Sequence, residues 1–144
     1  MTAMVFRRNL TDGPNACLFW HYPINMFAAS MTTIYKIIDR DEWDAARACG
    51  RYAGSRDDKR DGFIHFSTRD QLCGTAARHF SGQANLTLLS IDGAQLGQAL
   101  KWEASRAGAL FPHLYAVLPV SSVVRQWPLP LDDAGVHNFP DDLT

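Results

Sequence analysis

Regular alternation of hydrophobic and polar residues begins after Met31 and predicts a series of short strands with two helices among them. The segment 86–91 is almost continuously apolar, so we expect it at the centre of a sheet. Strands and helices do not alternate strictly, which favours the α+β class with mixed or antiparallel sheets. The predicted strands cover residues 33–38, 62–67, 86–91, 100–103, 113–118 and 123–127.

The two predicted helices each begin with a capping signal. Asp39 is followed by Glu42, and Thr68 by Gln71, in the spacing of a capping box, and an amphipathic pattern and then a glycine follow each pair. Between the two helices, residues 51–61 contain glycine and a run of mixed charges. We therefore predict a solvated loop over this segment.

Residues 1–30 show neither the helical nor the strand periodicity of hydrophobic residues and are interrupted by prolines. One interpretation is an export signal whose apolar region is 16–29, but His21 and Pro23 lie inside that region. The other is that Met31 is the true start and that the preceding stretch is a disordered or wrongly assigned extension. We favour the second, with a single domain over residues 31–144 and a mobile tail from about residue 129.

The composition of the chain argues against several classes of binding partner. The 144 residues carry 14 Lys+Arg against 15 Asp+Glu, so no large field attracts nucleic acid or an anionic membrane. No segment approaches the ~20 apolar residues of a membrane helix. Cys17, Cys49 and Cys73 are odd in number and form no C-x-x-C motif, so we expect reduced thiols in a cytoplasmic protein and no zinc site.

The predicted strand 62–67 carries the first candidate for chemistry. Its period of two places Phe63, His65 and Ser67 on one face. Ile64 and Phe66 lie on the other face, where we expect the core. His65 and Ser67 would then line an open face, whereas the alternative is a core histidine hydrogen-bonded to the backbone.

A second candidate lies in the predicted strands 100–103 and 113–118. Glu103 follows a tryptophan and precedes Arg106, while His113 and Tyr115 share one face of the later strand. A carboxylate in such a setting can act as a general base or accept a sugar hydroxyl. The alternative for Glu103 is a structural salt bridge with Arg106. No histidine has the spacing of a recognised metal site.

Five motifs follow one another along the chain: Ile34-Tyr35-Lys36-Ile37, Tyr52-Ala53-Gly54-Ser55, Asp61-Gly62-Phe63-Ile64-His65-Phe66-Ser67-Thr68, Leu100-Lys101-Trp102-Glu103 and Phe111-Pro112-His113-Leu114-Tyr115. Together they resemble the bacterial family catalogued as domain of unknown function 952, over residues 31 to about 127. The resemblance implies a fold like that of the ADP-ribosyltransferases, in which two small split sheets, with two main helices, hold NAD between them. Residues 63–124 are also similar to the NAD-binding half of the RNA 2'-phosphotransferases.

The resemblance implies a small nucleotide-like ligand, with NAD as the candidate cofactor. Where the NAD enzymes carry an Arg, or a His followed by Gly-Thr, this chain reads Tyr35-Lys36-Ile37-Ile38 and lacks that clamp. We therefore predict a binding domain, with an active ADP-ribosyl-transferring or NAD-cleaving enzyme and a structural domain without ligand as alternatives. The candidate catalytic residues are Glu103 and His65. The candidate ligand-binding residues are Tyr35, Lys36, Phe63, Ser67, Arg106, His113 and Tyr115.

Overall fold

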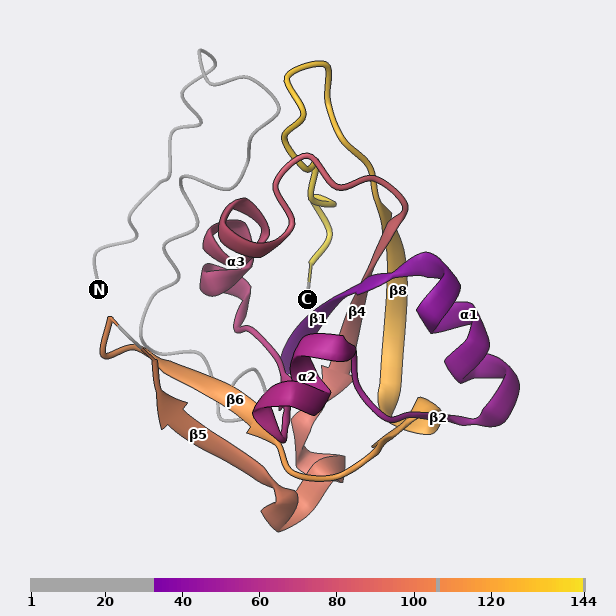
Figure 1. Ribbon diagram of the computed structural model, residues 1–144, viewed down its shortest axis with the longest axis vertical. Helices are drawn as coiled ribbons and strands as arrows, with labels where there is room; N and C mark the ends of the chain where they lie inside the picture. Colours follow the sequence, from indigo (N-terminus) through magenta and orange to yellow (C-terminus); the bar gives the residue numbers. More distant parts are fainter. Residues whose placement is uncertain (1–32, 106, 144) are drawn as a thin grey trace, which may run out of the picture.

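The computed structural model describes residues 33–105 and 107–143 (Figure 1). The strands are β1 (Thr33–Asp39), β2 (Arg51–Tyr52), β3 (Ile64–His65), β4 (Leu86–Asp92), β5 (Leu100–Ala104), β6 (Leu110–Leu114), β7 (Leu118–Pro119) and β8 (Val123–Leu129). The helices are α1 (Arg40–Cys49), α2 (Arg56–Asp61) and α3 (Leu72–His79), and the short 3-10 helices are η3 (Arg69–Gln71), η4 (Gly93–Ala99) and η5 (Val120–Ser122).

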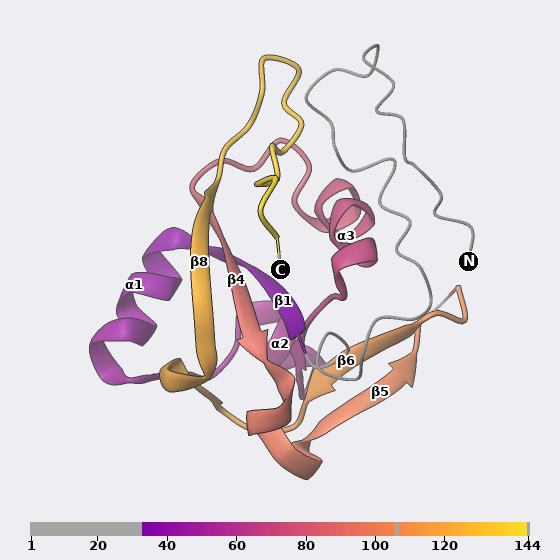
Figure 2. The ribbon, with the colours of Figure 1, turned by 180° about the vertical axis from the view of Figure 1, so that it is seen from behind.

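The strands form three antiparallel sheets, in the orders β1-β4-β8, β3-β6-β5 and β2-β7. Figure 2 shows the first of these with β4 between its neighbours, as the apolar pattern of that strand predicts. The two larger sheets meet where Tyr35 and Ser67 exchange backbone hydrogen bonds of 2.8 Å. The α+β class with antiparallel sheets and few helices is therefore confirmed.

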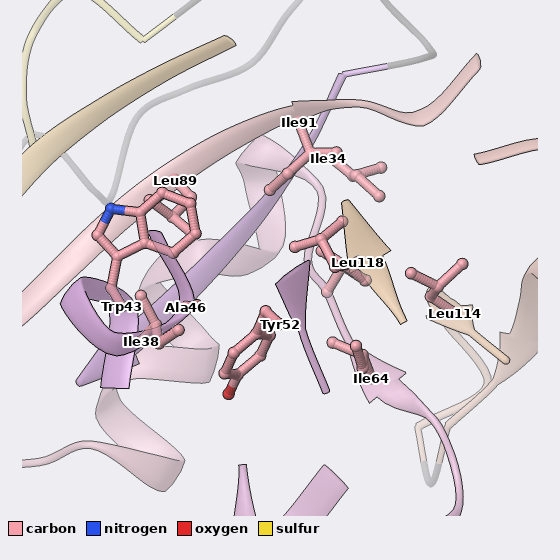
Figure 3. Packing of buried hydrophobic residues seen from close by; sticks show 11 residues of the cluster. Ile34, Ile38, Trp43, Ala46, Tyr52, Ile64, Leu89, Ile91, Leu114 and Leu118 are labelled. Carbon is pink, nitrogen blue, oxygen red and sulfur yellow. The ribbon is translucent and has the colours of Figure 1, made fainter. Parts of the chain in front are cut away.

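Two hydrophobic cores lie on opposite sides of the β1-β4-β8 sheet because side chains alternate along β1. Ile34 and Ile38 pack on the side of α1, and Tyr35 and Ile37 on the side of α3. The helices stand on the two sides of the sheet in Figures 1 and 2. Figure 3 shows the α1 core, whose labelled members are Ile34, Ile38, Trp43, Ala46, Tyr52, Ile64, Leu89, Ile91, Leu114 and Leu118.

Both predicted helices begin at their predicted caps. The Asp39 carboxylate accepts hydrogen bonds from the backbone N–H groups of the first turn of α1. Thr68 and Gln71 form their capping box, which opens η3 and then α3. The strands predicted over 113–118 and 62–67 have wrong bounds, because β6 already ends at Leu114 and β3 contains only two residues.

The prediction of a solvated loop over residues 51–61 is wrong. The segment contains β2 and the whole of α2. Ser55 and Asp58 form a capping box at the start of α2, and Gly62 closes it in the left-handed conformation at φ 86°. Because α2 has no apolar stripe, caps and a single buried acid stabilise it rather than the periodicity on which the prediction relied.

The segment that follows β8, predicted to be a mobile tail, packs back on the domain. His137 and Leu143 are buried, and His137 Nε2 lies 2.8 Å from the carbonyl oxygen of Gln83. Residues 1–30 lie outside the described residues. Cys49 is a free thiol. No helix in the described segments 33–105 and 107–143 is long and apolar enough to cross a membrane.

Candidate functional site

Asp58 is a buried carboxylate on α2 that accepts hydrogen bonds on both oxygens. Its side chain is 3% exposed. Oδ2 accepts the backbone N–H of Ser55 at 2.9 Å and lies 3.1 Å from Lys36 Nζ. Oδ1 accepts the backbone N–H of His65 at 3.1 Å and lies 2.7 Å from the ring Nδ1 of His65. A buried acid is stable only when its charge is paired in this way.

Lys36 supplies that charge from the middle of β1. Its side chain is 7% exposed, and Nζ also donates to the carbonyl oxygen of His65 at 3.0 Å. The rings of Tyr52 and Phe66 each lie 5.8 Å from Nζ. Lys36, nominated by the sequence as a ligand-binding residue, thus joins β1 to α2 and β3 from an almost inaccessible position.

His65 lies at the edge of this buried cluster, with its side chain 39% exposed. Nδ1 faces Asp58, and Nε2 lies 3.1 Å from Asp61 Oδ2 at the end of α2. Within residues 33–105 and 107–143 no backbone carbonyl binds its ring, so the core-histidine alternative does not describe it. Ile64 and Phe66 on either side are buried, as the alternation predicts.

The ionised form of Asp58 is strongly favoured. Burial alone would raise the pKa of its carboxyl group, but the His65 ring, the Lys36 ammonium and the backbone N–H groups of Ser55 and His65 together lower that pKa far below its usual range. Protonation of Asp58 would therefore oppose folding.

We expect the free energy of unfolding to fall as the pH is lowered below about 5. A carboxyl group whose pKa is depressed in the folded state stabilises the fold above its unfolded pKa, and that contribution is lost as the pH approaches the folded value. Urea unfolding of wild type and of Asp58→Asn between about pH 3 and 7 measures the effect. A wild-type slope equal to that of Asp58→Asn would contradict this assignment.

Glu103 forms a second cluster on the neighbouring sheet. Oε1 accepts the hydroxyl of Tyr115 at 2.7 Å and lies 3.1 Å from Nδ1 of His113. The pairing of β5 with β6 sets Lys101 opposite His113, which brings Glu103 diagonally onto the same face. Hydrogen bonds from Tyr115 and His113 lower the pKa of Glu103, so the carboxylate is ionised at neutral pH. Arg106, its alternative partner, lies outside the described residues.

Phe63 connects the two clusters. Its ring stacks on that of His113 with centroids 4.1 Å apart, and it lies 4.6 Å from the ring of His65 and 5.2 Å from that of Tyr115. The pairing of β3 with β6 sets His65 opposite His113, and their rings are 5.5 Å apart. We call this set the histidine face; it consists of Phe63, His65, Glu103, His113 and Tyr115.

Three of the other nominated residues, Tyr35, Lys36 and Ser67, do not join the histidine face. Tyr35 is 2% exposed in the core beside α3, and Ser67 is buried with Oγ 2.9 Å from Thr75 Oγ1. Lys36 lies beneath the face with Asp58. In the described part of the chain, no group of three or more His, Cys, Asp or Glu residues is arranged to hold a metal ion.

Three charged residues that contact the histidine face were not nominated by the sequence: Asp58, Asp61 and Lys101. Asp58 and Asp61 were assigned to a solvated loop, although the Ser55-x-x-Asp58 spacing is a capping signal that indicates a helix there. Lys101 Nζ lies 4.9 Å from the ring centroid of Tyr115. It adds a positive charge beside Glu103.

Solved structures and a family model match this chain. Protein CC0527 from Caulobacter crescentus is similar to it: the crystal structure is 57% identical, with a TM-score of 0.71 over 74% of this chain and 93% of that one. The solution structure of CC0527 is 58% identical, with a TM-score of 0.67 over 74% and 91% of the two chains. No curated protein shows a significant match. Residues 37–126 match the family model described as "Protein of unknown function (DUF952)", and the chain belongs to this family.

Proposed function

We propose that the histidine face binds NAD or a related nucleotide, in a fold with the split-sheet arrangement of the ADP-ribosyltransferases. One observation carries the proposal: residues from three separate segments, β5, β6 with its continuation and the stretch around β3, bring aromatic rings and an ionised carboxylate together on one face. A structural role does not require such a combination at a partly exposed position.

The chemistry of the face suits the parts of a nucleotide. Phe63 and Tyr115 offer aromatic surfaces on which a planar ring can stack. Among the described residues, both hydrogen bonds of the Glu103 side chain go to Oε1, which leaves Oε2 to accept a ribose hydroxyl. Tyr115 is 43% exposed, so a ligand can reach this side of the face.

The contacts of Lys36 in β1 favour binding over catalysis as the function of the histidine face. NAD enzymes of the resembled class hold the dinucleotide with a residue of that strand, whereas here Lys36 is committed to Asp58 and to the His65 carbonyl. The second candidate is cleavage of NAD, because the ionised Glu103 could stabilise a developing positive charge on the ribose. Release of nicotinamide from NAD by the wild-type protein distinguishes the two candidates.

We expect NAD or a nucleotide of its class to raise the melting temperature of the full-length protein. A ligand at a hundred times its dissociation constant adds about 2.7 kcal/mol of stability. Glu103→Gln should remove most of the shift because it loses the ionised acceptor. Asp44→Asn, an exposed acid on α1 remote from the face, should keep it.

A panel of NAD, ADP-ribose and nucleoside phosphates that leaves the wild-type melting temperature unchanged would overturn the proposed function and favour a structural domain. A shift that survives unchanged in Glu103→Gln would place binding elsewhere on the protein.

A further inference from the structure

The two imidazoles of the histidine face differ in what their nitrogens contact. Both ring nitrogens of His65 lie beside carboxylates, Nδ1 beside Asp58 and Nε2 beside Asp61. His113 Nδ1 lies beside Glu103. Across the described segments of the chain, His113 Nε2 makes no hydrogen bond or ion pair. His113 therefore keeps one nitrogen for a ligand or water, whereas each nitrogen of His65 faces a carboxylate.

Glu103 determines which nitrogen of His113 carries the proton. An ionised carboxylate only accepts hydrogen bonds, so the nitrogen that faces it must be the N–H donor. The Tyr115 hydroxyl donates to the same oxygen and fixes the carboxylate in place. The neutral ring of His113 then holds its hydrogen on Nδ1 and its lone pair on Nε2. Phe63 stacked on the ring restricts its rotation.

We propose that His113, rather than His65, is the proton-accepting residue of the histidine face, with Glu103 and Tyr115 as its positioning residues. The proposal rests on the proposed function, because it gives the bound molecule a partner for its hydroxyl. A ribose hydroxyl or a water donates its hydrogen to Nε2; on full transfer the O–H bond breaks, an N–H bond forms and the oxygen keeps the electron pair. The resulting imidazolium stays paired with Glu103 through Nδ1–H.

The first test is the tautomer of His113, read from its ring ¹⁵N chemical shifts in the full-length protein. We expect the Nδ1–H form in the neutral ring. Glu103→Gln should shift the population toward the Nε2–H form, because the amide of glutamine can donate to Nδ1. Asp61→Asn is the matched control, since Asp61 contacts His65, and it should leave the His113 signals unchanged. A wild-type His113 in the Nε2–H form would overturn the proposal.

The second test is acylation by diethyl pyrocarbonate, mapped by mass spectrometry on the intact fold. Exposure alone ranks His65 first, at 39% against 12% for His113. The contacts rank them the other way, because the reagent needs an accessible lone pair: Asp61 lies against Nε2 of His65, whereas Nε2 of His113 has no such neighbour in the described chain. We expect His113 to react several times faster than His65. Faster reaction at His65 would overturn the proposal.

Addition of NAD separates this inference from the proposed function. If NAD raises the melting temperature but the Nε2 signal of His113 does not move, NAD binds and the inference about His113 is wrong. If NAD has no effect on the melting temperature, the proposed function fails for NAD, and the tautomer and acylation results still decide whether His113 is the proton acceptor of this face.

Discussion

Asp58→Asn is expected to lower the free energy of unfolding by about 3–5 kcal/mol, the range observed when one partner of a buried ion pair is removed. The substitution keeps the shape of the side chain but leaves the Lys36 ammonium buried without its counterion. It also replaces one of the two acceptor oxygens with an NH2 group, and both oxygen positions face hydrogen-bond donors. Urea denaturation followed by circular dichroism measures the loss.

Asp57→Asn is the matched control, because Asp57 is the same residue type in the preceding position of α2 and its side chain is 70% exposed. It should stay within about 0.5 kcal/mol of wild type. Equal stability of the two variants would contradict the buried pair, whereas failure of Asp58→Asn alone to fold would agree with it.

Gly54→Ala is expected to destabilise the protein by the next largest amount. Gly54 has φ +106°, and a Cβ placed there would lie 2.9 Å from Asp58 Cβ. The left-handed conformation costs about 1–2 kcal/mol for a residue with a side chain. Relief of that close contact, with Ile64 Cγ1 also 3.6 Å from the added Cβ, adds an overpacking cost of about 1–3 kcal/mol. Urea denaturation measures the sum of the conformational and overpacking costs.

Gly50→Ala separates these two costs. Gly50 has φ +80°, but no atom lies within 4 Å of an added Cβ. It should show the conformational cost alone. If Gly54→Ala is no more destabilising than Gly50→Ala, the close approach to Asp58 does not constrain the fold.

Local signals predicted the parts of the fold that local chemistry decides. The caps at Asp39 and Thr68 and the apolar run of β4 each depend on residues close in sequence. The helix α2 was missed because its residues are charged at every position and only Asp58 is buried. Its burial depends on Lys36, which the fold brings from a strand outside α2, and no local pattern contains that contact.

The candidate site was predictable to the extent that side chains alternate along a strand. Alternation correctly grouped His113 with Tyr115. It also correctly placed His65 on the face of its strand that points away from the buried Ile64. It failed for Ser67 because β3 ends at His65, and the chain then turns to pair with β1.

Binding of NAD at the histidine face can be followed by an NMR titration of the ¹⁵N-labelled 144-residue protein. We expect backbone shift changes that saturate with NAD and are concentrated at residues 63–65, 101–103 and 113–115, with little change in α1. Absence of saturable changes, or changes confined to residues outside the histidine face, would contradict this expectation.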